Sequence, residues 1–390
     1  MQQSSVSGPQ DLDVNAKTVQ LVNLIGEIGP DIGEISKRLG QFKESVRYRY
    51  KEKILRRHYQ IRAEADYGAL GLKRVVMKLV VAEEYSKRAH ELFDTMSDVC
   101  YLVAYAGTKP YDVYVVHAAV PQEFTSEFHE IMEGLRDKGI FTEIEFFDCD
   151  WFRVLPMRAE CYDFDEGVWD FDWSNPPPVD EKAARATVSE RKHIDKVDLL
   201  LLKELWKNSD RSLTEVQAAI KKVNGVEINY KTLAWHYSNH VIGQRLITSY
   251  SITWSGGIYN FALDRPERLP NHAYLGLSLI VRGTDEKDKM RIRSQLNRLP
   301  FQWSEAAGAS YYSQLFFPLD SVNEALDYLK TVLKPYAGRA EIFLLDMVEF
   351  KSFTIGYKLW DDQNARWTFD RAELLPRLEL SAIETGKRTA

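Results

Sequence analysis

The sequence contains the same pattern of residues twice, and this duplication constrains the possible folds more than any other feature. Two blocks recur, each at a constant spacing: Val46, Tyr48, Arg49, Tyr50 and Ile54 match Leu233, Trp235, His236, Tyr237 and Val241, and Asp148, Phe152, Arg153, Tyr162, Asp163, Trp169, Phe171 and Asp172 match Asp346, Phe350, Lys351, Trp360, Asp361, Trp367, Phe369 and Asp370. An internal repeat indicates that one structural unit occurs twice. We therefore expect two related halves, residues 11–173 and 192–378.

A linker is predicted between the halves, at residues 174–191. It contains three consecutive prolines, Pro176 to Pro178, which stiffen a chain and do not enter a helix interior or a central strand. At 390 residues the chain also exceeds the size of one ordinary domain. Each half is therefore expected to contain more than one compact unit.

Composition excludes several classes of protein. The net charge of −6 excludes a protein that coats nucleic acid through its overall charge. No apolar stretch approaches the roughly 20 residues that span a bilayer, and the polar N-terminus lacks an export signal, so a cytoplasmic protein is expected. Three cysteines without metal-type spacing indicate neither a disulfide framework nor a Cys-based zinc site.

The first half opens with a predicted winged helix-turn-helix at residues 11–66. Apolar spacing predicts helices over 14–28, 31–39 and 43–56, with Asp31 as an N-cap and Gly40 in the turn. Residues 59–65 alternate like a strand, as a wing would. Three short helices joined in this way are typical of a DNA-binding module.

The third helix of this module is the predicted recognition helix. Between Lys43 and Arg62 there are eight Lys and Arg residues and only two acidic residues, Glu44 and Glu52, an excess that favours phosphate binding. Its N-terminal polar residues are expected at base edges, with Tyr48, Arg56 and Arg57 on the backbone. The predicted DNA-contacting residues of this half are Gln41, Lys43, Glu44, Ser45, Arg47, Tyr48, Arg49, Lys51, Arg56 and Arg57.

A second winged helix-turn-helix is predicted at residues 192–255, with a less basic recognition helix over 229–240. Its predicted DNA contacts are Asn229, Lys231, Thr232 and Trp235. A packing role without DNA contact is the alternative. His236 and His240 have metal-ligand spacing, but no carboxylate accompanies them in the sequence, so no metal site is expected.

Each helix-turn-helix is followed by a predicted α/β sandwich, at residues 67–173 and 256–378. The predicted order of elements is βαββαβ, which is the ferredoxin-like arrangement. Such a sheet leaves one apolar face uncovered, so we expect the two copies to pair as a pseudo-dimer within one chain. The predicted class is α+β. The aromatic, acidic segments 162–173 and 360–371 occur in both copies and are expected to be structural braces.

This layout resembles the leucine-responsive regulator family, Lrp/AsnC. The resemblance rests on short motifs: Ile194, Asp195, Asp198, Leu201 and Leu202 in the first helix of the second copy, Val46 and Arg49 in the recognition helix of the first, and Gly107 with Tyr111 and Asp112 after the second strand. It implies a transcription regulator that binds double-stranded DNA, further assembly of chains, and a small-molecule effector at Gly107 and Asp112. Here the turn between Gly107 and Asp112 is enlarged, which argues against amino-acid sensing. No enzymatic activity and no cofactor are expected.

Two alternatives come from other classes of function. Some tetrapyrrole-processing decarboxylases, of the siroheme type, resemble the same tandem layout, but they need a pocket with poised His, Arg and Tyr residues, and the eight histidines here are scattered, with only His117 at the end of a predicted strand. An architectural protein without sequence-specific DNA contact is the other alternative.

Overall fold

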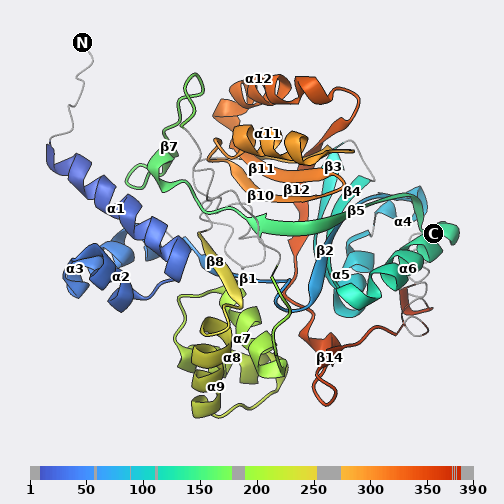
Figure 1. Cartoon of the computed structure of the whole chain (residues 1–390), viewed down its shortest axis with the longest axis horizontal. Helices are drawn as coiled ribbons and strands as arrows, with labels where there is room; N and C mark the ends of the chain where they lie inside the picture. Colours follow the sequence, from blue (N-terminus) through green and yellow to red (C-terminus); the bar gives the residue numbers. More distant parts are fainter. Residues whose placement is uncertain are drawn as a thin grey trace.

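A computed structural model describes residues 9–56, 59–87, 89–109, 113–177, 189–252, 274–370, 372, 374 and 376–378. The fold is α+β: two helical modules lie beside eight strands that carry helices on their outer sides (Figure 1). Part of the predicted linker, 178–188, and part of the second half, 253–273, lie outside the described residues. None of the described helices combines the length and the apolar character needed to cross a bilayer.

The first helical module has the three helices expected from the sequence. They are α1 (Pro9–Ile28), α2 (Ile32–Leu39) and α3 (Lys43–Tyr50), the last extended by a π-helical turn, η1 (Lys51–Leu55). Asp31 caps α2 by accepting from the Glu34 amide at 3.0 Å, and Gly40 ends it with a φ of 62°. The apolar side chains of Ile35, Val46 and Ile54 are fully buried, as their spacing predicts.

The second module repeats this arrangement with α7 (Lys196–Lys207), α8 (Leu213–Asn224) and α9 (Tyr230–His236), which continues into η4 (Tyr237–Ile242). Ser212 and Glu215 form the expected capping box at the start of α8. A second capping box, between Asp195 and Asp198, starts α7.

The strands that follow the two helical modules pair with each other. Strand β1 (Ile61–Ala65) pairs with β8 (Ile247–Ile252) in antiparallel register, with Ala63 opposite Tyr250. The alternating pattern of 59–65 predicted this strand correctly, but it did not indicate the partner, because alternation reports which face is buried and not which strand lies alongside. This two-stranded ribbon joins the two halves.

Both sandwiches show the predicted βαββαβ order. The first consists of β2 (Leu72–Val81), α4 (Glu83–Ser86), α5 (Ala89–Val99), β3 (Leu102–Lys109), β4 (Val113–Pro121), η2 (Gln122–Phe124), α6 (Thr125–Asp137) and β5 (Phe141–Val154). The second consists of β9 (Tyr274–Val281), α11 (Glu286–Leu296), β10 (Gln302–Gly308), β11 (Tyr311–Pro318), η7 (Leu319–Ser321), α12 (Val322–Leu333), η8 (Lys334–Tyr336) and β12 (Ala340–Ser352).

The two sheets join edge to edge and close on each other. Strand β5 pairs with β10, and β3 pairs with β12, so every strand has two neighbours in the order β10-β11-β9-β12-β3-β4-β2-β5. A buried cluster between them draws side chains from both copies: Val76, Val115, Phe147, Cys149, Ile280, Ala306, Tyr312 and Phe343. The prediction that the copies cover each other's uncovered sheet faces is confirmed.

The aromatic segments form small hairpins after each sandwich. They comprise η3 (Ala159–Cys161), β6 (Tyr162–Asp163) and β7 (Val168–Trp169) in one copy, and η9 (Tyr357–Leu359), β13 (Trp360–Asp361) and β14 (Arg366–Trp367) in the other. The Trp367 side chain is buried, and its indole N–H donates to the Leu70 carbonyl at 2.8 Å. The second hairpin thus braces the first copy, as a structural role predicts.

Candidate functional site

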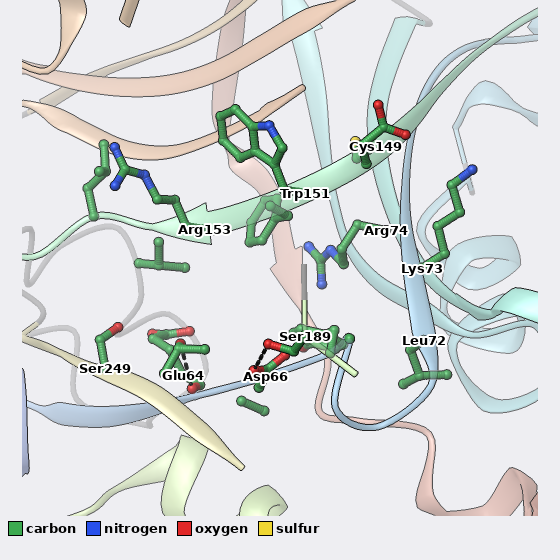
Figure 2. A pocket seen from close by; sticks show the side chains of 18 of the residues that line it. Glu64, Asp66, Leu72, Lys73, Arg74, Cys149, Trp151, Arg153, Ser189 and Ser249 are labelled. Carbon is green, nitrogen blue, oxygen red and sulfur yellow. Dashed lines mark hydrogen bonds between the residues drawn. The ribbon is translucent and has the colours of Figure 1, made fainter. Parts of the chain in front are cut away.

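A cavity of about 380 Å³ lies between the β1–β8 ribbon and the closed sheet, in the size range of small-molecule sites. Figure 2 shows Arg74 projecting from β2 into this space, with Glu64 and Asp66 on the β1 side and Trp151 and Arg153 on β5. A second cavity of about 80 Å³ adjoins it. Five residues line both cavities: Glu64, Tyr67, Arg74, Phe152 and Val154.

Arg74 is the cation at the junction of the two cavities. Arg74 is only 8% exposed, and its guanidinium lies over the rings of Tyr67 and Phe152, at 4.6 and 4.1 Å from their centres. Its Nε atom is buried without a hydrogen-bond partner among the described residues. Within the described part of the chain, no carboxylate lies at salt-bridge distance from it. A buried guanidinium in this condition favours an anionic ligand.

The other cations that line the larger cavity are paired with carboxylates. Arg153 binds the fully buried Glu305 through Nε and Nη2, at 2.6 and 2.5 Å from Oε1. Lys73 lies 3.5 Å from Asp148, whose pKa is lowered, chiefly by the hydrogen bond from His129. Arg74 is therefore the cation of the cavity wall that retains the most binding capacity for an anion.

Glu64 provides a carboxyl group beside Arg74. Burial raises its pKa above the ordinary value, although Ser251, Arg62 and Arg74 each act in the opposite direction. The Ser251 hydroxyl donates to its Oε1 at 2.5 Å. Burial also raises the pKa of the neighbouring Tyr67. A carboxyl group with a raised pKa in a cavity is suited to proton donation.

His117 lies in the middle of β4, not at a strand end as the sequence suggested. Its Nε2 atom is 2.8 Å from the Tyr312 hydroxyl of β11, and its Nδ1 atom is buried without a partner among the described residues. Burial and Arg74 lower its pKa well below the ordinary value, so the imidazole is neutral near pH 7. It lines the smaller cavity, at a contact between the two copies.

The described part of the predicted recognition helix in the first half is largely accessible. The exposed members are Lys43, Glu44, Ser45, Arg47, Tyr48, Lys51 and Arg56, while Gln41 and Arg49 are half-buried and hydrogen-bonded to each other. Arg47 pairs with Glu44 at 2.7 Å, and Arg56 pairs with Glu52. Arg57 lies outside the described residues. The structure leaves these surfaces open, so DNA contact here stays a prediction.

The predicted contacts of the second half are also exposed: Asn229, Lys231, Thr232 and Trp235. Asn229 also has a structural role, because its side chain caps α9 by accepting a hydrogen bond from the Lys231 amide at 2.8 Å. That oxygen is therefore already engaged.

The predicted effector residues do not meet in a described site. Gly107 lies inside β3, where a Cβ atom would approach Glu349 Oε2 to 2.6 Å, so the glycine is explained by packing. Asp112 lies outside the described residues. The cavity residues Arg74 and Glu64 were not identified from the sequence. One signal was available, the charged residues Arg62, Glu64 and Arg74 within strongly apolar strand patterns.

Solved structures similar to this chain include one that spans nearly its whole length. The crystal structure of the siroheme decarboxylase NirDL matches 93% of this chain and 99% of its own, at 10% sequence identity and a TM-score of 0.50. Its complex with an iron-uroporphyrin III analogue matches 96% and 99% at a TM-score of 0.47 and 10% identity. E. coli AsnC matches 35% of this chain and 89% of its own, at 13% identity and a TM-score of 0.25.

At 10% sequence identity, the similarity to NirDL concerns the fold alone. No family model and no curated protein matches the sequence. A Pyrococcus furiosus regulator of the AsnC family likewise matches 35% of this chain, at 14% identity and a TM-score of 0.27.

The expectation of no enzymatic activity was wrong. The neighbour that spans nearly the whole chain is an enzyme, so the tandem arrangement is compatible with catalysis. The histidines are scattered along the sequence and gave no indication of this cavity, which arginine, glutamate and aromatic side chains line. The architecture itself, two tandem copies of helix-turn-helix plus ferredoxin-like sandwich, is shared with that enzyme.

Proposed function

We propose that the chain is a decarboxylase acting on a small molecule that bears several carboxylate groups, such as a tetrapyrrole of the siroheme type. The observation that carries this proposal is Arg74, a buried guanidinium at the junction of two cavities that is stacked on two rings and not ion-paired with any described carboxylate. The substrate class comes from the structural neighbour, whose name specifies siroheme.

The residues have distinct roles in this proposal. Arg74 binds a substrate carboxylate, and the faces of Tyr67 and Phe152 hold the guanidinium in place. In the reaction, the bond between the carboxylate carbon and its neighbouring carbon breaks, CO₂ leaves, and the electron pair stays on the neighbouring carbon. That carbon takes a proton from Glu64, whose raised pKa keeps the proton available.

The first test is the variant Arg74→Gln, which keeps hydrogen-bonding capacity but removes the charge. We expect it to weaken binding of siroheme by roughly 10- to 100-fold, since a hydrogen bond to a charged group contributes about 1.5–3 kcal/mol. Visible absorbance of the bound tetrapyrrole measures the affinity. Arg136→Gln, on the exposed surface of α6, is the matched control and should bind like the unmodified chain.

The second test separates binding from chemistry. Glu64→Gln should retain affinity while turnover falls by roughly 10²- to 10⁴-fold, the usual contribution of general acid–base catalysis. Mass spectrometry of the product, which loses CO₂ for each carboxylate removed, measures turnover. If the unmodified chain neither binds siroheme nor releases CO₂ from it, the proposal fails.

DNA binding by the first helix-turn-helix is a second candidate function. The observation that favours it is the accessibility of α3: Tyr48 is 69% exposed and the preceding Phe42 is 86% exposed, beside the exposed cations Lys43 and Lys51. Large exposed aromatic side chains on a basic helix are typical of an interaction surface. The two functions use different parts of the molecule, so each can be tested without the other.

A further inference from the structure

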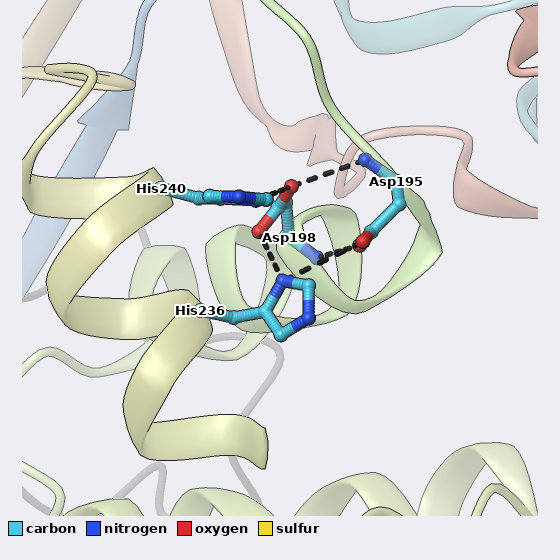
Figure 3. Close-up of side chains that lie close together, drawn as sticks. All are labelled: Asp195, Asp198, His236 and His240. Carbon is cyan, nitrogen blue, oxygen red and sulfur yellow. Dashed lines mark hydrogen bonds and ion pairs between the residues drawn. The ribbon is translucent and has the colours of Figure 1, made fainter.

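Four potential metal ligands meet in the second helix-turn-helix. They come as two pairs, from two segments that are well separated in the sequence. Asp195 and Asp198 come from the start of α7, and His236 and His240 come from the end of α9 and from η4. One ligand atom from each lies within 4.8 Å of the others. Figure 3 shows the two imidazoles and the two carboxylates facing a common point. The carboxylates that the sequence did not reveal are supplied by a different helix.

The backbone fixes the two aspartates. Asp195 caps α7, its Oδ1 accepting from the amides of Val197 and Asp198 at 2.8 and 3.1 Å, while its Oδ2 lies 3.5 Å from His236 Nδ1. Asp198 Oδ2 completes the capping box by accepting from the Asp195 amide at 3.0 Å. The carboxylates are therefore held in position before any ion arrives, which lowers the entropic cost of binding.

The two histidines approach the same carboxylate through the same ring atom. His236 Nδ1 lies 3.0 Å from Asp198 Oδ1, and His240 Nδ1 lies 2.9 Å from Asp198 Oδ2. Asp198 is fully buried, and the two histidine side chains are only 10% and 13% exposed. Separations of 2.9 to 3.5 Å are close to the spacing of about 3.3 Å between ligand atoms around tetrahedral zinc, whose bonds are about 2.0–2.2 Å.

We propose that Asp195, Asp198, His236 and His240 bind one divalent transition-metal ion, with Zn²⁺ the best match to imidazole and carboxylate ligands in a four-coordinate site. The ion takes the place of the hydrogen bonds that otherwise join both imidazoles to Asp198. It fastens the first helix of the module to the helix that carries Lys231 and Trp235 on its exposed side.

Two features of the surroundings support a site peculiar to this half. The ring of Trp235 lies 4.7 Å from that of His240 and 5.1 Å from that of His236, so it packs against both imidazoles. In the repeat, Arg49 corresponds to His236, and Lys53 takes the position of His240. Both counterparts are cations, so the first half has no imidazole ligand at either position.

The test uses the full chain after treatment with a chelator. Added Co²⁺ should bind once per chain and give the intense visible d–d bands of a tetrahedral site, and Zn²⁺ should displace it. Titration calorimetry of Zn²⁺ should give one binding site per chain. Absence of tetrahedral bands with the unmodified chain would overturn the proposal, whatever the behaviour of variants.

His236→Gln and His240→Gln should each lower Zn²⁺ affinity by at least tenfold and abolish the tetrahedral cobalt bands. His90→Gln, an exposed histidine on α5, is the matched control and should bind the metal like the unmodified chain. Equal affinity of all four proteins would place the ion elsewhere and also overturn the proposal. Siroheme binding by the cavity gives a separate readout, so neither result depends on the decarboxylase proposal.

Discussion

Two glycines, Gly107 inside β3 and Gly308 at the end of β10, show how single residues fix the closed sheet. A Cβ atom on Gly308 would lie 2.0 Å from the backbone oxygen of Asp148, where β10 meets β5. A Cβ atom on Gly107 would meet Glu349, whose closest atom is the end of a flexible side chain. Backbone cannot move aside as a side chain can, so the two positions differ in tolerance although both are glycines.

We expect Gly308→Ala to destabilise the fold more than Gly107→Ala. Overpacking typically costs about 1–3 kcal/mol, and Gly308→Ala should fall at or beyond the upper end of that range. Denaturant unfolding measures both. Gly26→Ala is the control: its nearest neighbour is 3.6 Å away and it lies within α1, where alanine is favoured over glycine. Equal losses at Gly308 and Gly107 would contradict this argument.

Glu64 should make stability depend on pH. Its folded-state pKa is raised by burial, so the folded state holds this proton more tightly than the unfolded chain. Stability is therefore lost as pH rises above the unfolded value of about 4.3 and through the folded pKa. We expect the free energy of unfolding of the unmodified chain to fall over this window relative to that of Glu64→Gln.

Glu215 provides a control of opposite sign. Its pKa is lowered, first by the hydrogen bond from the Ser212 side chain, so its contribution is present above the unfolded pKa and is lost as pH falls. Glu215→Gln should therefore be less stable than the unmodified chain at neutral pH, and this difference should shrink as the pH falls. Parallel pH profiles for Glu64→Gln and the unmodified chain would show that burial does not perturb Glu64.

At the scale of elements, the recognition helix α3 makes the clearest prediction. Replacing Lys43, Arg47 and Lys51 by alanine should weaken binding to duplex DNA and reduce the dependence of log affinity on log salt by about 0.9 for each lost phosphate contact. Fluorescence anisotropy over a range of salt concentrations measures this slope. Lys231→Ala should change it less, and an unchanged slope in the triple variant would argue against DNA contact by α3.

The elements themselves could be predicted because helix and strand periodicities are local. The spacing of Val46, Tyr50 and Ile54 defined α3, and the capping box at Ser212 defined the start of α8. The partner of β1 and the convergence of Asp198 with His240 could not be predicted, because such contacts join segments far apart in the sequence. The cavity could not be predicted for the same reason, because it forms only where β1, β2 and β5 come together in the fold.

For the whole molecule, the closed sheet predicts that neither half is complete alone. Separated from the second half, the first half exposes the edges of β3 and β5 that normally pair with β12 and β10. Unpaired edges associate readily. Residues 9–177 expressed alone should therefore self-associate, and mixing with 189–378 should give a one-to-one complex, as measured by light scattering. A stable, folded monomer of either half would contradict this.

The covalent joining of the halves removes a restriction that applies to assemblies of identical subunits. In a two-fold homodimer every side chain appears at both related places, so a change that suits one place is imposed on the other. Here Arg153 meets Glu305 while its repeat partner Lys351 meets Asp94, and Arg49 stands where the other half has His236. Each half is thus free to specialise by single substitutions, one for metal chemistry and the other for anions, without duplicating the change.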